Sequence, residues 1–459
     1  MQQGLHVAII GAGIGGLSCA LALAKYGIQR IDVYEATSDL GFVGAGIQLA
    51  PNMGRILKRL GCWEPVTKEA TEVKVASIRQ HNDNKELGRV EFAHVREEYG
   101  TPHMVSHRSS LAGELYNACK EEKAITFHFD SSCSIKTWQP KPKLVVTPRN
   151  GESYDVFADV VLAADGIKSS VRPQILKELG VDVEVTDSGQ SAYRIMLTRD
   201  QMKSDSEILE LLEADQVTRW IGERRHIIAY PISNKNIYNI STAQPDTHFA
   251  SAPSATYTTR GSKVDMLDSF KDFCPLIQRM LNLVPEGDVC EWKLRVHSPL
   301  PTWVRGSVAL VGDACHPTLP HLAQGAAQAV EDAGVLAVIL SMLPEANSDS
   351  INKALRMYER VRKERAETLV DLAAASCRTL HLGEGAAREE RDKQFAALKT
   401  KGGPSPDKYM DAEVQKMIMG TDVMELARVE FQRTFSPTVV DCTPCLRSKM
   451  RRASRIWIG

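Results

Sequence analysis

Apolar residues in the first part of the chain are grouped as buried strands and helices require. Residues 5–10, LHVAII, form a mostly apolar run that is typical of a strand buried on both faces. A glycine-rich turn follows, and the next apolar residues predict a helix that ends near Tyr26. Residues 31–34 predict a second strand, which ends at Glu35. A strand, a helix and a second strand in this order are typical of an α/β fold.

The middle of the chain has a different pattern. Residues 183–250 are β-rich, with HIIAYPI and NIYNIST as predicted strands, whereas residues 325–382 are mostly helical. A β-rich block between two parts of an α/β domain predicts a discontinuous, Rossmann-like domain with an inserted β-sheet domain and a C-terminal helical segment. We assign residues 1–180 and 291–382 to the Rossmann-like domain, 181–290 to the inserted sheet that covers its site, and 383–459 to the helical tail.

Composition narrows the classes of function. The 459 residues are 43% hydrophobic and 25% charged, and the net charge is −1, so nucleic acid is not an expected partner. Ten scattered cysteines suit a reducing compartment, and we expect a cytoplasmic protein. Cys442 and Cys445 form one CxxC without a second ligand pair, so no metal is expected. No apolar stretch has the length or flanks of a membrane span or signal peptide, and the oligomeric state stays open.

Residues 11–16, GAGIGG, fit the pattern G-x-G-x-x-G between the first strand and helix. Gly11 and Gly13 would permit a tight turn and let backbone N–H groups approach a pyrophosphate, and Gly16 would let the helix pack closely on the strand. Glu35 follows Gly16 by 19 residues, where a carboxylate would bind a ribose hydroxyl. Together these residues predict a dinucleotide site, but they do not distinguish NAD from FAD.

A second apolar run, VALVGDACHP at residues 308–317, delivers one carboxylate at the end of a buried strand. Ligands of open α/β sheets bind outside the carboxyl ends of the strands, which favours a ligand contact for Asp313. The alternative is that Asp313 caps the helix that follows.

Several stretches resemble the class A flavoprotein aromatic hydroxylases, the family that includes salicylate hydroxylase. They are LAADGIKSSVR (162–172), VALVGDACHPTLPHLAQGAAQAVEDA (308–333), GFVGAGIQLAPNMGRILKRLG (41–61) and HRSSL (107–111). The resemblance covers roughly residues 5–380, with the motifs in the family's order. It departs from many relatives at Ala36, where they have Arg, and at Ala323, where they have Gly.

The resemblance implies that the dinucleotide is FAD. It places a ribityl hydroxyl on Asp313 and the flavin beside the helix that starts at Gly325 and Ala326, whose N-terminus would stabilise the reduced flavin anion. It also places the backbone of Gly46 and Ile47 near the flavin ring.

Two further residues follow from the same resemblance. Arg108 is expected to contact the flavin side of the cofactor, because an Arg is unfavourable at a helix N-terminus without an anion nearby. Asp165, with Arg172, belongs to a motif linked to FAD and nicotinamide binding. The alternative for Asp165 is a strand-end residue that starts a helix.

In this family NAD(P)H reduces FAD, O2 adds to the reduced flavin, and the flavin hydroperoxide transfers oxygen to an activated ring. We therefore expect a monooxygenase that hydroxylates a phenolic or aromatic-acid substrate, with or without decarboxylation, using NADH or NADPH. The inserted sheet offers Arg194 to pair with a carboxylate or phenolate and Tyr230 to orient the ring oxygen, with His226 a further substrate contact. The alternatives are epoxidation or dearomatisation of a larger natural product, or flavin binding without oxygenase activity.

Overall fold

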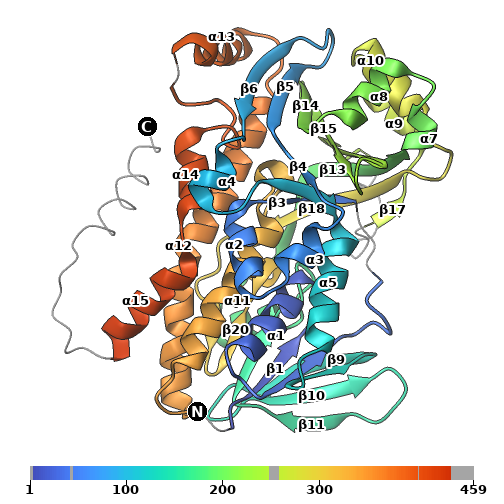
Figure 1. Cartoon of the computed structure of the whole chain (residues 1–459). Helices are drawn as coiled ribbons and strands as arrows, with labels where there is room; N and C mark the ends of the chain where they lie inside the picture. Colours follow the sequence, from blue (N-terminus) through green and yellow to red (C-terminus); the bar gives the residue numbers. More distant parts are fainter. Residues whose placement is uncertain (1–3, 42–44, 248–257, 402, 436–459) are drawn as a thin grey trace.

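A computed structural model describes residues 4–41, 45–247, 258–401 and 403–435 of the chain. The Cys442–Cys445 pair and the basic C-terminal residues lie outside the described residues. Figure 1 shows a molecule with one sheet near the N-terminus and a second, larger sheet at the opposite end, with helices between and beside them.

The first sheet has six strands in the order β19-β20-β12-β1-β2-β8, and all its neighbours are parallel except the β19–β20 pair. β20 pairs with β12, although well over a hundred residues separate them, so the domain is discontinuous as predicted. Helices α1 and α11 pack against each other over this sheet, and α5 packs against α1 (Figure 1). The bounds are β1 (His6–Ile10), α1 (Ile14–Lys25), β2 (Arg30–Tyr34), α5 (Arg108–Lys120), β8 (Ile125–His128), β12 (Val160–Ala163), β19 (Val304–Arg305), β20 (Val308–Leu310) and α11 (Gly325–Ser341).

The second sheet has eight strands in the order β17-β18-β13-β16-β15-β14-β5-β6. One of its faces is covered by short helices, and the opposite face packs on the long helix α12 and on the C-terminal segment. The bounds are β5 (Val75–Gln80), β6 (Glu86–Glu91), β13 (Val185–Thr198), α7 (Arg199–Met202), α8 (Ser206–Glu213), β14 (Gln216–Gly222), β15 (Arg225–Ile232), β16 (Ile237–Pro245), β17 (Thr258–Arg260), α9 (Lys263–Ser269), α10 (Pro275–Asn282), β18 (Cys290–His297) and α12 (Ser348–Leu380).

The predicted domain boundaries do not follow the sheets. β5 and β6 belong to the eight-stranded sheet but come from the range assigned to the Rossmann-like domain, because β5 pairs in parallel with the distant strand β14. β18 also crosses the boundary placed at residue 290. Sequence periodicity reports which residues form a strand, but not which sheet the strand joins.

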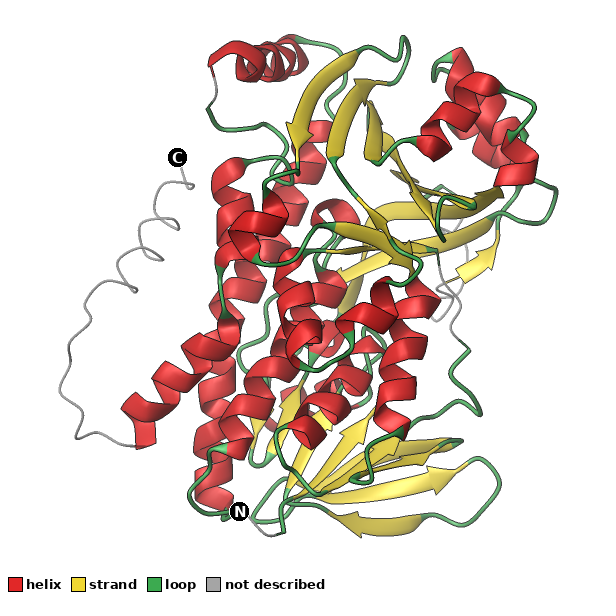
Figure 2. Cartoon of the chain, viewed as in Figure 1, coloured by secondary structure: helices red, strands yellow, loops and turns green. Residues whose placement is uncertain are grey.

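The remaining elements are two small sheets and the peripheral helices (Figure 2). Among the described residues, no helix combines the length and apolar character needed to cross a membrane. The bounds are β3 (Gly46–Leu49), α2 (Pro51–Arg59), α3 (Trp63–Thr67), β4 (Thr71–Glu72), α4 (Val95–Tyr99), β7 (Met104–His107), β9 (Ser131–Thr137), β10 (Lys143–Pro148), β11 (Tyr154–Phe157), α6 (Val171–Glu178), the 3-10 helices η2 (Gly312–Ala314) and η3 (Pro320–Leu322), α13 (Ala386–Lys401), α14 (Ala412–Gly420) and α15 (Val423–Phe435).

Candidate functional site

The glycine-rich turn between β1 and α1 has no room for side chains at two positions. Gly11 has a φ of +95°, and a Cβ there would lie 2.6 Å from the carbonyl oxygen of Ala164. A Cβ on Gly16 would lie 1.9 Å from the carbonyl oxygen of Gly11. Both positions therefore require glycine, because the turn, the helix and the end of β12 are in direct backbone contact.

Gly13 has a different reason to be glycine. It is exposed, its own Cβ would meet open space, and it caps α1 without any side chain that accepts from the first-turn N–H groups. An uncapped helix N-terminus next to open space suits the approach of a phosphate. Glu35 holds this turn, since its Oε2 accepts a hydrogen bond from the Ala12 N–H at 2.8 Å. The other carboxylate oxygen, Oε1, accepts hydrogen bonds from the N–H and the hydroxyl of Thr37.

Asp313 lies in the 3-10 turn η2 at the end of β20. Its side chain is exposed, and within the described residues its carboxylate makes no hydrogen bond, so it does not cap the following helix. Desolvation by the surrounding protein raises the pKa of this carboxyl, and the positive charges of His316 and Arg108 partly offset that rise. An ionisable acceptor in a partly desolvated position without a protein donor suits a hydrogen bond from a ligand hydroxyl.

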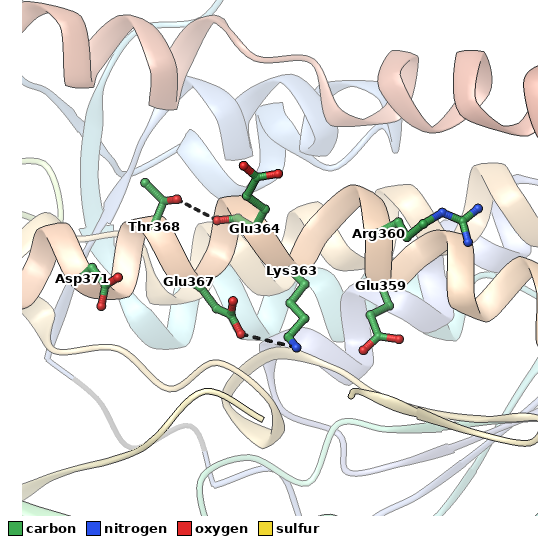
Figure 3. A pocket seen from close by; sticks show the side chains of 7 residues that line it. All are labelled: Glu359, Arg360, Lys363, Glu364, Glu367, Thr368 and Asp371. Atoms are coloured by element: carbon green, nitrogen blue, oxygen red, sulfur yellow. Dashed lines mark hydrogen bonds and ion pairs between the residues drawn. The ribbon is translucent and has the colours of Figure 1, made fainter. Parts of the chain in front are cut away.

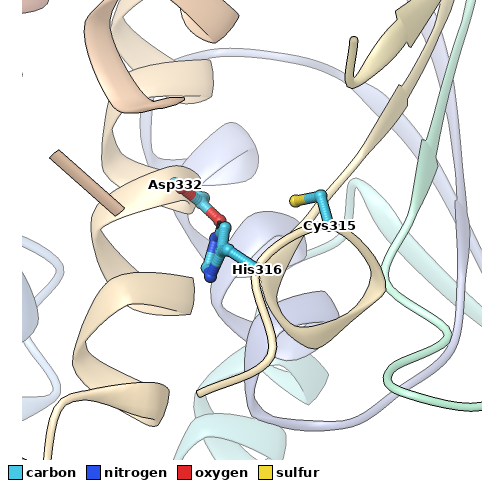
Figure 4. A group of neighbouring side chains, drawn as sticks. All are labelled: Cys315, His316 and Asp332. Carbon is cyan, nitrogen blue, oxygen red and sulfur yellow. Dashed lines mark hydrogen bonds and ion pairs between the residues drawn. The ribbon is translucent and has the colours of Figure 1, made fainter. Parts of the chain in front are cut away.

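A buried acid, Asp332 of α11, supports the turn that carries Asp313. One carboxylate oxygen accepts from Gly312 N at 3.0 Å and from His316 Nε2 at 2.6 Å, and the other accepts from Arg362 Nε at 2.8 Å. Burial opposes ionisation of Asp332, but His316 and Arg362 outweigh it and hold its pKa below the usual value. The side chains of Cys315, His316 and Asp332 gather within 4.8 Å, a spacing that could hold a metal ion (Figure 4). Since both Asp332 oxygens are occupied, we interpret the group as a structural ion-pair network.

The neighbouring residue Glu331 extends this network to α2 and adds a second arginine of α12. It accepts from Asn52 of α2 at 2.7 Å, and it is paired with Arg362 and Arg365 of α12 at 2.5 and 2.8 Å. All of these side chains are buried. Asn52 also donates to Gln324 at the start of α11. The network thus reaches residues 316–324, the loop before the helix that is expected to lie beside the flavin, which we call the predicted flavin loop.

Asp165 and Arg172 are used within the protein. Asp165 Oδ2 accepts from the N–H groups of Ser170 and Val171, which is the helix-starting alternative, while its Oδ1 is buried without a partner among the described residues. Arg172 is buried and donates to the carbonyl oxygens of Ala314 and Ile167. Arg172 therefore joins the stretch 162–172, to which it belongs, to the turn that carries Asp313. A cofactor contact by Asp165 stays a prediction.

Gly46 lies where the Rossmann-like part meets the eight-stranded sheet. Its N–H donates to Asn239 Oδ1 at 2.6 Å, and a Cβ on Gly46 would lie 2.6 Å from a ring carbon of Tyr230. Ile47 follows it in β3, and Arg108 begins α5 after the paired strand β7. Arg108 is exposed, and its charge affects the pKa of both Asp313 and Arg194. The structure therefore brings Gly46, Arg108 and Asp313 around one region.

The loop before α11 ends in an uncapped helix. Ala323 has a φ of +54°, so the family's more usual glycine would be less strained there. α11 begins at Gly325 and Ala326, and no side chain caps its first turn. This helix N-terminus can therefore donate its N–H groups to a ligand.

Arg194 lies on the face of the eight-stranded sheet opposite the helices α7–α10, because its neighbours Tyr193 and Ile195 point into the core with those helices. Its guanidinium stacks on the ring of Trp292 at 4.6 Å. The guanidinium forms no hydrogen bond or ion pair with a described residue. Burial and the like charge of Arg108 lower the pKa of Arg194, and Tyr230 acts in the opposite sense.

Tyr230 is also buried, and its hydroxyl makes no hydrogen bond within the described residues. Burial raises its pKa, and the charge of Arg194 lowers it, so the two predicted substrate residues are electrostatic neighbours. Neither the Arg194 guanidinium nor the Tyr230 hydroxyl hydrogen-bonds to a described residue, so both can interact with a ligand, and their substrate role stays a prediction.

His226 lies four residues from Tyr230 on β15, in a buried cluster of three histidines. Its Nδ1 is 2.7 Å from Nε2 of His381, and its ring centroid is 5.3 Å from that of His321. Burial, followed by His381 and Arg219, lowers its pKa well below the usual value. His226 is therefore a neutral side chain already bonded to α12's C-cap residue, and a substrate contact by it stays a prediction.

A separate hollow of about 510 Å³ lies along the outer face of α12 (Figure 3). None of its lining residues belongs to the predicted cofactor or substrate site. They are Glu359, Arg360, Lys363, Glu364, Glu367, Thr368 and Asp371.

Comparison with known proteins gives a consistent result. Residues 4–373 match the protein family described as FAD binding domain. An FAD-dependent monooxygenase of Arthrinium sp is 31% identical over 400 residues, which cover 87% of this chain and 90% of that protein. 3-Hydroxybenzoate 6-hydroxylase 1 of Aquipseudomonas alcaligenes is 31% identical over 395 residues, covering 86% and 94%. A solved salicylate hydroxylase substrate complex has a TM-score of 0.76 and 26% identity over 94% of this chain and 98% of that one.

Proposed function

We propose that this chain uses NAD(P)H and O2 to hydroxylate a phenolic or aromatic-acid substrate. The chain belongs to the FAD binding domain family and is an FAD-dependent monooxygenase of the aromatic hydroxylase type. The observation that carries the substrate class is Arg194, a half-buried cation without an anionic partner among the described residues. The hydroxybenzoate named in a relative at 31% identity is an anion of this kind.

The residues of the Rossmann-like part fit FAD. Gly13 and the uncapped start of α1 would hold the pyrophosphate, and Glu35 the ribose. Asp313, which has no hydrogen-bond donor among the described residues, would accept from the ribityl chain. Bound FAD would supply a centre that accepts electrons from NAD(P)H and activates O2, so that one oxygen atom can be transferred to an aromatic ring.

Asp313→Ala should weaken FAD binding without unfolding the chain. Loss of a hydrogen bond to a charged acceptor is worth about 1.5–3 kcal/mol, which corresponds to roughly 10- to 150-fold in Kd. Fluorescence titration of the apoprotein with FAD measures the change. Asp200→Ala, which removes an exposed carboxylate from α7, is the matched control. Equal FAD affinity in the two variants would remove Asp313 from the cofactor site.

On the other side of the site, this chain's own groups would bind and orient the substrate. Arg194 would offset a carboxylate or phenolate, and an adjacent cation lowers the pKa of a phenol, which makes its ring more electron-rich. The Tyr230 hydroxyl would hold the ring oxygen and so fix which carbon faces the flavin. The stack of Trp292 and the buried surroundings of Tyr230 would keep water away from the reacting atoms.

A screen of phenols and aromatic acids tests the proposal. NAD(P)H oxidation, H2O2 release and hydroxylated product are measured together for each compound, with NADH and NADPH in parallel. A substrate is expected to accelerate NAD(P)H oxidation and to give hydroxylated product in near-equal amount. If only large neutral natural products are oxygenated, the aromatic-acid class is wrong. If no compound accelerates flavin reduction or yields product, the hydroxylase assignment of this chain fails.

A further inference from the structure

A short part of the C-terminal segment, residues 405–411, lies inside the protein rather than on it. Most of its side chains are buried, including Asp407, Tyr409 and Asp411. The segment lies between α13 and α14, well beyond residue 373, where the family match ends. Buried irregular chain needs partners for its polar groups, and those partners place the segment.

Asp407 joins the segment to two other parts of the molecule, β14 and α12. Its carboxylate faces Arg219 of β14, with Nη1 to oxygen distances of 3.3 and 3.4 Å, and accepts from Ser376 Oγ of α12 at 2.8 Å. Arg219 also donates to the carbonyl oxygen of His321 in the predicted flavin loop at 3.1 Å. One arginine thus links the substrate sheet, the flavin loop and the C-terminal segment.

Tyr409 reaches the strand that is expected to lie beside the flavin. Its hydroxyl donates to Gln48 Oε1 at 2.8 Å and lies 3.2 Å from His103 Nε2, which is itself 3.0 Å from the same oxygen. Burial lowers the pKa of His103 to about 4, so this ring is neutral at pH 7. The Tyr409 hydroxyl donates to this oxygen and the His103 ring lies within hydrogen-bonding distance of it, and these contacts orient the Gln48 amide.

The amide fixed in this way lies next to the predicted substrate residues. Gln48 is two residues after Gly46 on β3, so both positions are on the strand face that meets Tyr230. Tyr230 and Tyr409 belong to one packed cluster, and the charge of Tyr230 affects the pKa of Tyr409. Gln48 is buried, yet its Nε2 donates to no described residue.

We propose that Tyr409 is a positioning residue that holds Gln48 so that its Nε2 donates to an acceptor on the aromatic substrate, and that residues 405–411 thereby help to set specificity. The inference rests on the proposed function, since it assigns a further contact in the same site. Gln48 Nε2 has no acceptor among the described residues, and an acceptor on a ligand would supply one.

The test is a double-mutant cycle on the full chain loaded with FAD. Tyr409→Phe keeps the ring but removes the hydroxyl that donates to Gln48 Oε1. Gln48→Leu removes the Nε2 donor itself. Substrate Kd is read from the change in flavin absorbance, so it requires no turnover. For the best aromatic acid from the screen, Tyr409→Phe should raise Kd about three- to tenfold with unchanged FAD content. Adding Tyr409→Phe to Gln48→Leu should cause no further loss.

Tyr99→Phe is the matched control, because its ring packs beside Gly420 of α14, on another part of the C-terminal segment, and should leave Kd unchanged. Additive losses in the cycle, or equal Kd values for Tyr409→Phe and Tyr99→Phe, overturn the inference. A parent enzyme that binds aromatic acids without hydroxylating them contradicts the proposed function instead, and the cycle still decides the role of Tyr409.

Discussion

Arg194→Ala is expected to weaken binding of an aromatic acid by roughly 10- to 150-fold, the equivalent of about 1.5–3 kcal/mol for a hydrogen bond to a charged group. The guanidinium of the half-buried Arg194 stacks on Trp292 and has no anionic partner among the described residues, so the substrate would supply the compensating charge. Without the arginine's charge, the phenol group of a bound substrate also stays protonated more readily. Oxygen transfer to the ring then slows, and a larger share of the NAD(P)H consumed should yield H2O2. Substrate Kd and the ratio of product to NAD(P)H consumed measure both effects.

Two comparisons give this result its meaning. Arg194→Lys keeps the charge but loses the planar fork, so a partial recovery indicates a point charge and no recovery indicates bidentate recognition. Arg199→Ala removes an arginine just past the end of the same strand, where it pairs with Glu213 at the surface, and should leave coupling unchanged. FAD content should be normal in all three. Parent-like affinity and coupling in Arg194→Ala would exclude this residue from the substrate site.

The cofactor motifs could be predicted from the sequence because each is local. The turn at Gly11 and Gly16 depends on backbone contacts within a single strand–turn–helix unit and the end of β12. Asp313 follows directly from a strand with no polar face. In such cases the residue pattern and the geometry are set within a few positions of each other.

Other features required the tertiary structure. The place of β5 in the second sheet depends on its pairing with a strand about 140 residues later. Tyr409 comes from a segment that the sequence showed only as part of a helical tail, and its partners Gln48 and His103 are 361 and 306 residues away. Asp165 starts the helix that follows it, which is one of the two roles that the sequence left open, and its other oxygen is buried without a partner among the described residues.

One signal for the buried network was visible in the sequence. Glu331 and Asp332 lie just before the apolar run GVLAVILSML, and two adjacent acids close to such a run on one helix need cations in the interior. Arg362 and Arg365 supply them from α12, three residues apart and therefore on one helix face. Since Asp332 holds Gly312 N, this network connects the fold's stability to the position of Asp313.

Arg362→Met should therefore destabilise the protein and lower its FAD content together. Removing one partner from a buried ion pair costs about 3–5 kcal/mol, because the remaining charges keep their desolvation penalty. Arg362 is fully buried and contacts both Glu331 and Asp332, so both carboxylates lose a cation. Urea unfolding of the holoenzyme gives the stability, and flavin absorbance per chain gives the occupancy.

The pH dependence separates a charge effect from a packing effect. The folded pKa of Asp332 is held below its usual value of about 4, so its stabilising effect is present above that pH and is lost as the pH falls. The difference between parent and Arg362→Met should accordingly be full at pH 7, begin to shrink near pH 4 and be smaller at pH 3. Arg360→Met, two residues along the same helix with a half-exposed side chain, should lose little at either pH. A deficit in Arg362→Met that stays constant with pH would mean that lost packing, not lost charge, destabilises the protein.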